Sequence, residues 1–227
     1  MQILCFDSET TGLPKNYRAP TSDVDAWPHL VELAWMLVND GVVKTAMSYI
    51  IKPDGYEIPE EVSKIHGITT ARAMAEGVPL AFALGTMWAA QQQALYLVGH
   101  NAVFDGKIIR AACHRAGVTT ELTKWSTLDT MLLSTKHCNL PGKHGPKWPK
   151  LEELNNVLFG APHAGAHGAG ADVEATKNCF YKLMELGVIG QAEMDKADEK
   201  QAQIKAAVAA KEERERELIG KIEEEVL

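Results

Sequence analysis

Apolar runs of strand length alternate along the chain with longer segments in which apolar residues recur every three or four positions. The runs at residues 2–6, 30–38, 46–53, 95–101 and 125–130 predict strands, because they are short, apolar and bounded by turn-forming residues. A short helix is predicted to start at Pro59, and longer helices are predicted over residues 79–93, 103–117, 150–160 and 170–187. The sequence NDG at residues 39–41 predicts a hairpin turn between two of the strands.

The order of these elements predicts the fold class. Three strands come first, and helices and strands then alternate, which is typical of an α/β protein with a mixed sheet and helices on both faces. We expect a body over residues 1–190 and a charged helical tail over residues 191–227, where glutamate, lysine and alanine dominate. This tail is a candidate contact for a partner protein or for a second copy of the chain.

Amino-acid composition limits the class of protein but does not identify its function. Of the 227 residues, 46 % are hydrophobic, and no apolar run is long enough to cross a bilayer. The first acidic residues come too close to the N-terminus for a signal peptide. We therefore expect a soluble cytoplasmic protein with no membrane partner. Four cysteines without a CxxC pair predict reduced thiols. The net charge of −7 argues against nonspecific coating of duplex DNA, but acids that bind cations would leave nucleic acid open as a substrate.

Two carboxylates, Asp7 and Glu9, end the first apolar strand, in the sequence CFDSETTGL. Residues two apart on a strand face the same side, so these side chains stand together, whereas Ser8 points to the other face. Adjacent carboxylates repel one another and are costly to bury unless a cation lies between them. Mg²⁺ and Mn²⁺ prefer such oxygen ligands, and solvation at a strand end is the alternative explanation.

Two further acids lie at the starts of predicted helices. Asp105 shares a helix face with the apolar positions 108, 109 and 112, so it points toward the core, which attraction to the helix dipole does not explain. Asp172 starts another helix, after a glycine-rich loop that carries His167. The alternatives here are a helix N-cap for Asp172 and an exposed loop histidine for His167.

The strand end and the helix starts that carry these acids can converge at one edge of an open sheet, where α/β proteins hold ligands. Four carboxylates gathered there would be unstable without cations. Two metal ions about 3.5–4 Å apart form the type of site that cleaves phosphodiesters by in-line displacement. The pattern therefore predicts metal-dependent cleavage of a nucleic acid.

Four ordered segments resemble motifs of the DnaQ-like (DEDDh) 3′→5′ exonucleases: FDSETTGL, IPEEVSKIHGIT, HNAVFD and HGAGAD. The second of them resembles a segment of the proofreading members of that family, and together the motifs span residues 3–186. The resemblance implies a ribonuclease-H-like fold with a mixed five-stranded sheet. It also implies hydrolysis of the 3′-terminal nucleotide with two divalent cations, Mg²⁺ or Mn²⁺.

The resemblance implies a role for each matching position. Asp7, Glu9, Asp105 and Asp172 match the metal ligands, and His167 matches the general base. Asp7 would bridge both ions, Glu9 and Asp172 would hold the ion that activates water, and Asp105 would serve the other. An imidazole with an ordinary pKa of about 6.5 suits proton abstraction near neutral pH. The matching substrate-lining positions, with packing as the alternative for the last three, are Thr10, Thr11, Leu13, His66, Asn101 and Phe104.

These matches predict a metal-dependent 3′→5′ exonuclease that acts on single-stranded DNA. One alternative is an RNA-trimming exoribonuclease, since the 2′-hydroxyl is read by contacts that the sequence does not locate. The other is an exonuclease-fold interaction module for a polymerase, which would contact it through the tail, residues 191–227. All five catalytic positions are retained, which favours an enzyme over a module.

The chain departs from the family pattern between residues 130 and 151. This stretch contains no acid, but it has lysines at positions 136, 143, 147 and 150, two histidines and Trp148. An aromatic residue among lysines suits a single strand, because bases stack on the ring and lysines follow the phosphates. The alternatives are an ordinary solvated loop and anchoring of the loop to the body by Trp148 and Pro149.

Overall fold

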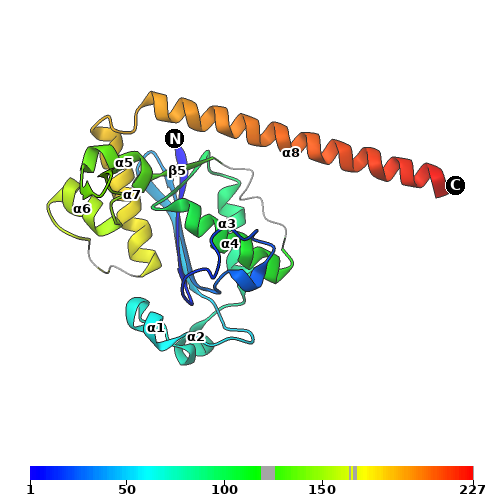
Figure 1. Ribbon diagram of the computed structural model, residues 1–227, viewed down its shortest axis with the longest axis horizontal. Helices are drawn as coiled ribbons and strands as arrows, with labels where there is room; N and C mark the ends of the chain where they lie inside the picture. Colours follow the sequence, from blue (N-terminus) through cyan, green and yellow to red (C-terminus); the bar gives the residue numbers. More distant parts are fainter. Residues whose placement is uncertain (119–125, 164, 166–167, 227) are drawn as a thin grey trace.

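A five-stranded mixed sheet forms the centre of the molecule (Figure 1). The computed structural model describes residues 1–118, 126–163, 165 and 168–226. Within the sheet the strand order is β3-β2-β1-β4-β5; the first three strands pair antiparallel, and β4 and β5 run parallel to β1. The strands are β1 (Gln2–Thr10), β2 (Leu30–Asn39), β3 (Val42–Ile50), β4 (Tyr96–Gly99) and β5 (Thr127–Asp129). The predicted mixed α/β fold is confirmed.

Helices cover both faces of the sheet (Figure 1). One face carries α3 (Leu80–Gln91) and α4 (Ala102–Ala116), and the other carries α5 (Thr130–Cys138), α6 (Leu151–Phe159) and α7 (Ala169–Glu185). Three short helical segments are η1 (Val24–Ala26), α1 (Glu60–His66) and α2 (Thr70–Glu76), and a small hairpin pairs β6 (Pro141–Gly142) with β7 (Gly145–Pro146). The last helix, α8 (Gln191–Val226), extends away from the body (Figure 1). No helix in the described ranges is both long and apolar enough to span a membrane.

The observed elements differ from the predicted ones in two places that matter for the site. Strand β1 runs on to Thr10, so Asp7 and Glu9 lie within a paired strand and not after it. The stretch that departs from the family pattern begins as a helix, α5, whose N-cap Asp129 accepts hydrogen bonds from the N–H groups of Met131 and Leu132. The sequence Asp-Thr at the end of β5 is thus a capping signal, which satisfies the first free N–H groups of the helix.

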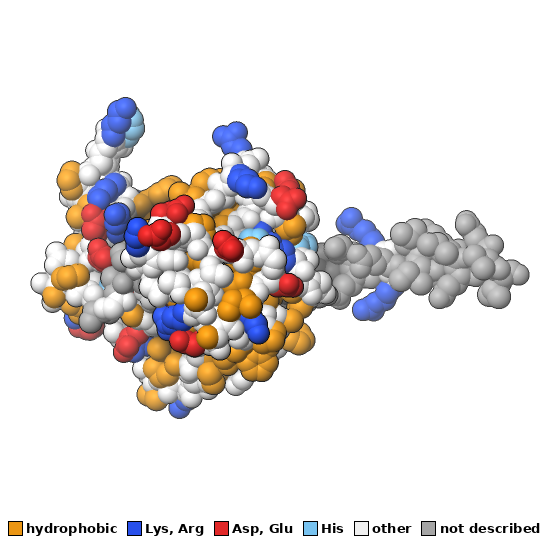
Figure 2. Space-filling model, turned by 90° about the horizontal axis from the view of Figure 1, so that it is seen from below, with side chains coloured by type: hydrophobic (Ala, Val, Ile, Leu, Met, Phe, Trp, Pro, Cys, Tyr) orange, Lys and Arg blue, Asp and Glu red, His pale blue; other side chains and the backbone are white. Residues whose placement is uncertain are grey.

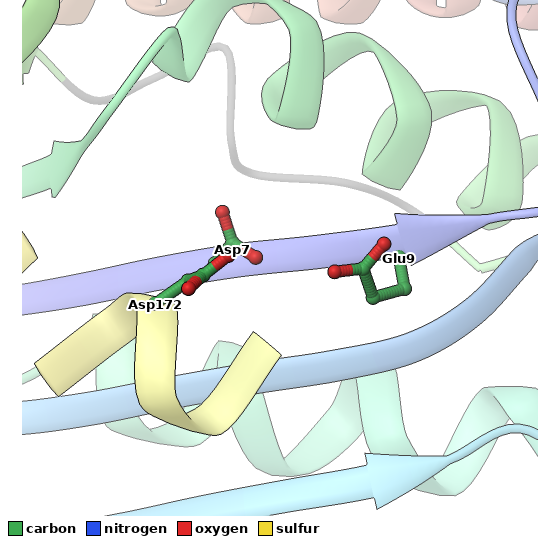
Figure 3. A group of neighbouring side chains, drawn as sticks. All are labelled: Asp7, Glu9 and Asp172. Carbon is green, nitrogen blue, oxygen red and sulfur yellow. The ribbon is translucent and has the colours of Figure 1, made fainter. Parts of the chain in front are cut away.

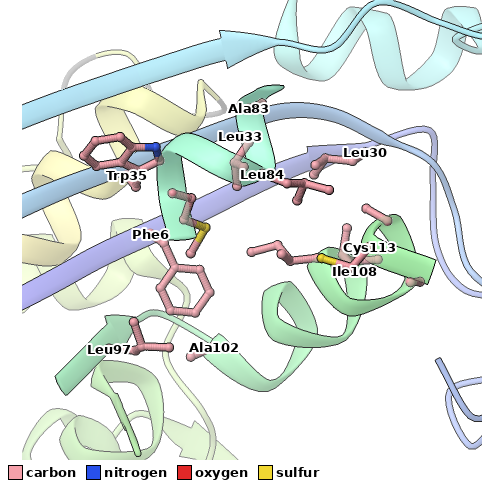
Figure 4. Packing of buried hydrophobic residues seen from close by; sticks show 14 of the residues in the cluster. Phe6, Leu30, Leu33, Trp35, Ala83, Leu84, Leu97, Ala102, Ile108 and Cys113 are labelled. Atoms are coloured by element: carbon pink, nitrogen blue, oxygen red, sulfur yellow. The ribbon is translucent and has the colours of Figure 1, made fainter. Parts of the chain in front are cut away.

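Alternating side chains of β1 supply both hydrophobic cores. Leu4 and Phe6 pack with α3 and α4, in the cluster shown in Figure 4, whereas Ile3 and Cys5 pack with α7 on the opposite face. This alternation follows from the period of two in a strand. Asp7 continues the series that faces α7, so the same pleat that builds the core aims the first carboxylate at the start of that helix.

The first turns of α8 belong to the packing of the body. Met194 and Ala197 are buried in the cluster around α7, and the Tyr96 hydroxyl donates a hydrogen bond to Asp198. The side chain of Gln201 accepts a hydrogen bond from the backbone N–H of Ser126. The charged helix is therefore docked at its start, and its later turns leave the body (Figure 1).

Gly99 allows helix α4 to begin directly against the end of β4. A Cβ atom at this position would lie 2.8 Å from the Cβ of Ala102. Ala102 starts α4, whose first turn carries Asp105. The closeness of strand and helix at Gly99 thus sets where one of the candidate metal ligands stands relative to β1.

We predict that Gly99→Ala destabilises the protein by about 1–3 kcal/mol, because the added methyl group overpacks a rigid contact. In a chain of this size this lowers Tm by roughly 3–10 °C. Gly85→Ala is the matched control, since Gly85 lies inside α3 with no atom within 4 Å of an added Cβ. This control should leave stability equal or raise it by up to about 1 kcal/mol. Thermal unfolding of both variants measures the effects, and equal Tm values for them would contradict the close packing described.

Candidate active site

Three carboxylates meet where β1 passes the start of α7 (Figure 3). Asp7 and Glu9 come from the strand and Asp172 from the first turn of the helix, and each offers one oxygen within 4.8 Å of the others. The N-cap of α7 is Gly168, so Asp172 does not serve as the cap. Its side chain instead lies in the carboxylate cluster.

Asp105 approaches this cluster from the opposite face of the sheet. It is 4 % exposed, and the Ser8 hydroxyl donates a hydrogen bond of 2.6 Å to its Oδ1 atom. Ser8 faces away from Asp7 and Glu9 and toward Asp105. By bonding one oxygen of Asp105, Ser8 fixes the orientation of this carboxylate.

Burial and neighbouring negative charges raise the pKa values of Asp7, Glu9 and Asp105. Burial, followed by the charges of Asp105 and Asp172, holds the pKa of Asp7 well above its usual range. Burial and then the charge of Asp172 raise the pKa of Glu9 to about 8. The pKa of Asp105 rises to about 7, chiefly through burial, against the hydrogen bond from Ser8, which lowers it. These acids therefore cannot all be ionised near neutral pH without a compensating positive charge.

Glu32 is a fifth acid in the site that the sequence analysis did not identify. It lies on β2 directly opposite Glu9, and its Oε2 atom accepts a 3.1 Å hydrogen bond from the backbone N–H of Ala169, the first residue of α7. Because Gly168 has no side chain to cap the helix, Glu32 supplies the acceptor from another strand. Ser48 donates a hydrogen bond to the other oxygen of Glu32. A single acid inside the apolar run at residues 30–38 was the available signal.

A histidine contacts the acidic cluster. The Nε2 atom of His163 lies 2.6 Å from Oδ1 of Asp172, and its side chain is 9 % exposed. The sequence analysis chose His167 as the general base, and that residue lies outside the described residues. The pair of histidines in the segment HAGAH was the signal for this second candidate.

The carboxyl ends of the parallel strands bring further polar groups to the same edge. Asn101 follows β4 in a left-handed conformation (φ 63°), and its N–H donates a 3.0 Å hydrogen bond to Asp129 at the end of β5. Parallel strands place their carboxyl ends together, which is where ligands bind in such sheets. This hydrogen bond fixes the turn after β4, from which α4 begins and carries Asp105 to the acidic cluster.

The predicted substrate-lining residues lie in different environments. Leu13 is 74 % exposed, Asn101 is exposed, and His66 is buried with its Nδ1 accepting a hydrogen bond from the N–H of Ile68. Thr10 donates to the carbonyl oxygen of Gly12. Of the other two, Thr11 accepts a hydrogen bond from the N–H of His29, and Phe104 packs against the core.

The residues present fit a divalent cation. Asp7, Glu9 and Asp172 offer hard oxygen atoms close together. Within the described part of the chain, no lysine or arginine forms an ion pair with any of these three. A bound dication would lower all the raised pKa values together and allow the cluster to ionise.

A family model described as an exonuclease, RNase_T, matches residues 4–180 of the chain. A protein of Mycobacterium tuberculosis named as a bifunctional exonuclease/endonuclease is 27 % identical over 194 residues, which cover 85 % of this chain and 28 % of that protein. A PolC-type DNA polymerase III of Caldanaerobacter subterraneus is 25 % identical over 194 residues, covering 86 % of this chain and 13 % of the polymerase. The chain thus spans less than a third of either relative.

Solved structures of E. coli Exonuclease I share the fold. The complex with a dT13 oligonucleotide superimposes with a TM-score of 0.63 at 24 % identity, over 81 % of this chain and 41 % of that one. The zinc-bound form of the complex with single-stranded DNA gives a TM-score of 0.63 at 24 % identity, over 82 % and 40 % of the two chains. At this level of identity the likeness establishes the fold.

We predict that the metal-free protein becomes less stable as the pH rises from about 4 to about 8. Carboxyl groups whose pKa is higher in the folded state stabilise it while they are protonated, and this contribution is lost as the pH passes through their folded-state pKa, about 7 for Asp105 and about 8 for Glu9. A loss of about 2 kcal/mol would lower Tm by roughly 4–8 °C.

Thermal unfolding in EDTA and in Mg²⁺ or Mn²⁺ at pH 5 and pH 8 tests this. The cations should raise Tm strongly at pH 8 and little at pH 5, because only ionised carboxylates bind them. In the control variant Asp7→Asn with Glu9→Gln, both the pH dependence and the metal effect should shrink. A Tm in EDTA that rises between pH 5 and pH 8 would contradict the raised pKa values.

Proposed function

The chain belongs to the RNase_T exonuclease family, and from that premise we propose that it removes nucleotides from the 3′ end of single-stranded DNA with two divalent cations and a histidine general base. The match to this family supports the resemblance to the DnaQ-like exonucleases, and cleavage from the 3′ end is part of the proposal. The single observation that carries the proposed mechanism is the cluster of Asp7, Glu9 and Asp172, with Asp105 beside it.

The carboxylates have separate tasks in this proposal. Asp7, on which the charges of Asp105, Asp172, Glu9 and Glu32 all act, would hold both cations. Glu9 and Asp172 would complete one site, and Asp105 would serve the other. Mg²⁺ or Mn²⁺, when bound, supplies an activated water and stabilises charge on the scissile phosphate. The rigidity of the set comes from Ser8, which holds Asp105, and from Glu32, which holds the start of α7.

The general base takes the proton from the attacking water. His167 is our proposed base, because its position matches the family's histidine and a neutral imidazole can accept a proton near pH 7. His163 instead contacts Asp172, a proposed metal ligand. A group in that position is suited to orient the ligand and to tune metal affinity.

Single-stranded DNA is the proposed substrate class. The polymerase relative is a DNA polymerase, and the E. coli Exonuclease I structures hold DNA oligonucleotides. The chain's net charge of −7 fits an enzyme that binds a free end through a local site and not a protein that coats duplex DNA. Polymerase contact through the tail, residues 191–227, remains a proposal on the same footing.

We predict that the protein shortens a 5′-labelled DNA oligonucleotide from its 3′ end in Mg²⁺ or Mn²⁺ and not in EDTA. Asp7→Asn should abolish the ladder, because the carboxylate that holds the cations is lost while its shape is kept. Digestion of matched single-stranded DNA, single-stranded RNA and duplex DNA gives the preference. The absence of any 3′ shortening with either ion would contradict the proposed function, and faster digestion of RNA would reverse the proposed substrate.

We predict different kinetic defects for the two histidines. His167→Gln should lower kcat by about 10²–10⁴-fold at every metal concentration, because a general base contributes that much. His163→Gln should raise the metal concentration for half-maximal activity by about 10–100-fold, with kcat recovered at high metal, because an outer contact to a ligand is lost. Titration of Mn²⁺ at saturating oligonucleotide separates these defects. A kcat loss in His163→Gln that metal does not restore would move the base role to His163.

A further inference from the structure

The stretch that carries clustered lysines is an ordered projection, which we call the basic arm (residues 136–150). Its hairpin pairs Pro141 with Pro146 and Gly142 with Gly145, and Lys143 and His144 form the tip. A Cβ atom at Gly142 would lie 2.6 Å from the carbonyl oxygen of Gly145, so the two strands can approach this closely only with glycine there. The arm therefore contains a short hairpin, whose residues 141–146 are exposed.

A half-buried histidine, His100, fixes the base of the basic arm next to the candidate active site. The Nε2 atom of His100 lies 2.9 Å from the carbonyl oxygen of Pro149, and its Nδ1 atom lies 3.0 Å from the Thr130 hydroxyl. A carbonyl only accepts hydrogen bonds, so Nε2 is the donor. His100 is followed directly by Asn101 and α4, and the charge of Asp172 acts on its imidazole. The arm thus has a set position relative to the acids.

Pro149 anchors the arm, and Trp148 does not. Pro149 is buried, whereas the side chain of Trp148 is 65 % exposed. Most of this large aromatic ring is exposed to water beside an anchored residue, and exposed aromatic rings are surfaces on which single-stranded bases can stack. The indole ring is therefore available to stack on a ligand.

The cations of the arm are largely free. Lys147 pairs with Glu153 at 2.5 Å, but Lys136 and Lys143 are exposed and form no ion pair within the described part of the chain. These positive charges gather on a protein whose net charge is −7, beside a site lined with carboxylates. Figure 2 shows groups of lysine and arginine side chains that project from the body, with acidic side chains between them.

We propose that the basic arm holds a single-stranded nucleic acid a few nucleotides upstream of the end that is cleaved, with Trp148 stacked on a base and Lys136 and Lys143 on phosphates. A polyanion is repelled by the acidic site, and a fixed positive arm offsets that repulsion. Lys143 is six residues from the anchor Pro149, a reach of at most about 20 Å. The tip of the arm can therefore contact the strand only within this distance of its anchor.

This inference rests on the proposed function for its choice of ligand, and strand binding in EDTA tests it without cleavage. The test variant combines Lys136→Ala, Lys143→Ala and Trp148→Ala, and the probe is a fluorescent 20-nucleotide oligo-dT followed by anisotropy. Loss of one stacked base and two phosphate contacts should raise Kd by about 10–100-fold. The slope of log Kd against log salt should fall by about 1.4, because each phosphate contact to a single strand contributes roughly 0.7. Hydrolysis of the p-nitrophenyl ester of thymidine 5′-monophosphate, which is too short to reach the arm, should be unchanged.

The matched control removes the same residue types elsewhere. Lys44 lies on β3 near its pairing with Val38, at the end of the sheet away from Glu9, Lys205 lies on α8, and Trp88 on α3 is 51 % exposed. Replacing these three with alanine should leave Kd and the salt slope unchanged. Trp148→Tyr should bind like wild type and Trp148→Leu should not, because stacking needs an aromatic ring whereas simple packing does not.

Each outcome decides a separate point. Unchanged strand binding in the arm variant, equal loss in the control variant, or no strand binding by the wild-type protein would overturn the role of the arm. Weaker binding in the arm variant alone supports it. A wild-type protein that binds through the arm but shortens no strand in Mg²⁺ or Mn²⁺ would contradict the proposed function and leave the role of the arm standing.

Discussion

Repulsion among carboxylates at the end of one strand is the constraint on which the rest of the structure depends. Asp7, Glu9 and Asp172 lie within 4.8 Å of one another, and burial with mutual charge raises the pKa of Glu9 to about 8. Such an arrangement opposes folding when no cation is bound, because ionised acids in a half-buried site destabilise it. The protein therefore sacrifices stability to hold cation ligands in advance, and the surrounding elements keep them from moving apart.

Two contacts from side chains other than the proposed metal ligands resist that repulsion. Ser8 holds one oxygen of Asp105, and Glu32 holds the backbone of Ala169 at the first turn of α7. The contact from Glu32 is unusual because it places another negatively charged side chain beside Glu9. Its benefit is a charged acceptor at a helix start whose own N-cap residue, Gly168, has none. Orientation of the ligands is thus obtained at the expense of further negative charge.

His100 connects the candidate active site with the basic arm on the surface. Burial lowers the pKa of this imidazole and keeps it neutral, so it can donate from Nε2 to Pro149 and meet the Thr130 hydroxyl at Nδ1. A single residue between β4 and α4 therefore connects the base of the basic arm with the helix that carries Asp105. Movement of the base of the arm relative to the acids would break these contacts. The lysines of the arm therefore have a defined position beside the carboxylate cluster.

The sequence by itself determined the α/β class, the acidic positions and the family, because those follow from local pattern. Periods of two and of 3.6 residues place strands and helices, and they also aim Asp7, Glu9 and Asp105. The tertiary structure alone decided that Ser8 contacts Asp105, that Glu32 caps α7 across 137 positions, and that Pro149 and not Trp148 anchors the arm. These contacts join residues far apart in the chain, and a pattern in one segment carries no information about which distant atom completes a hydrogen bond. The choice of His167 stays a prediction from the family motif, since it lies outside the described residues.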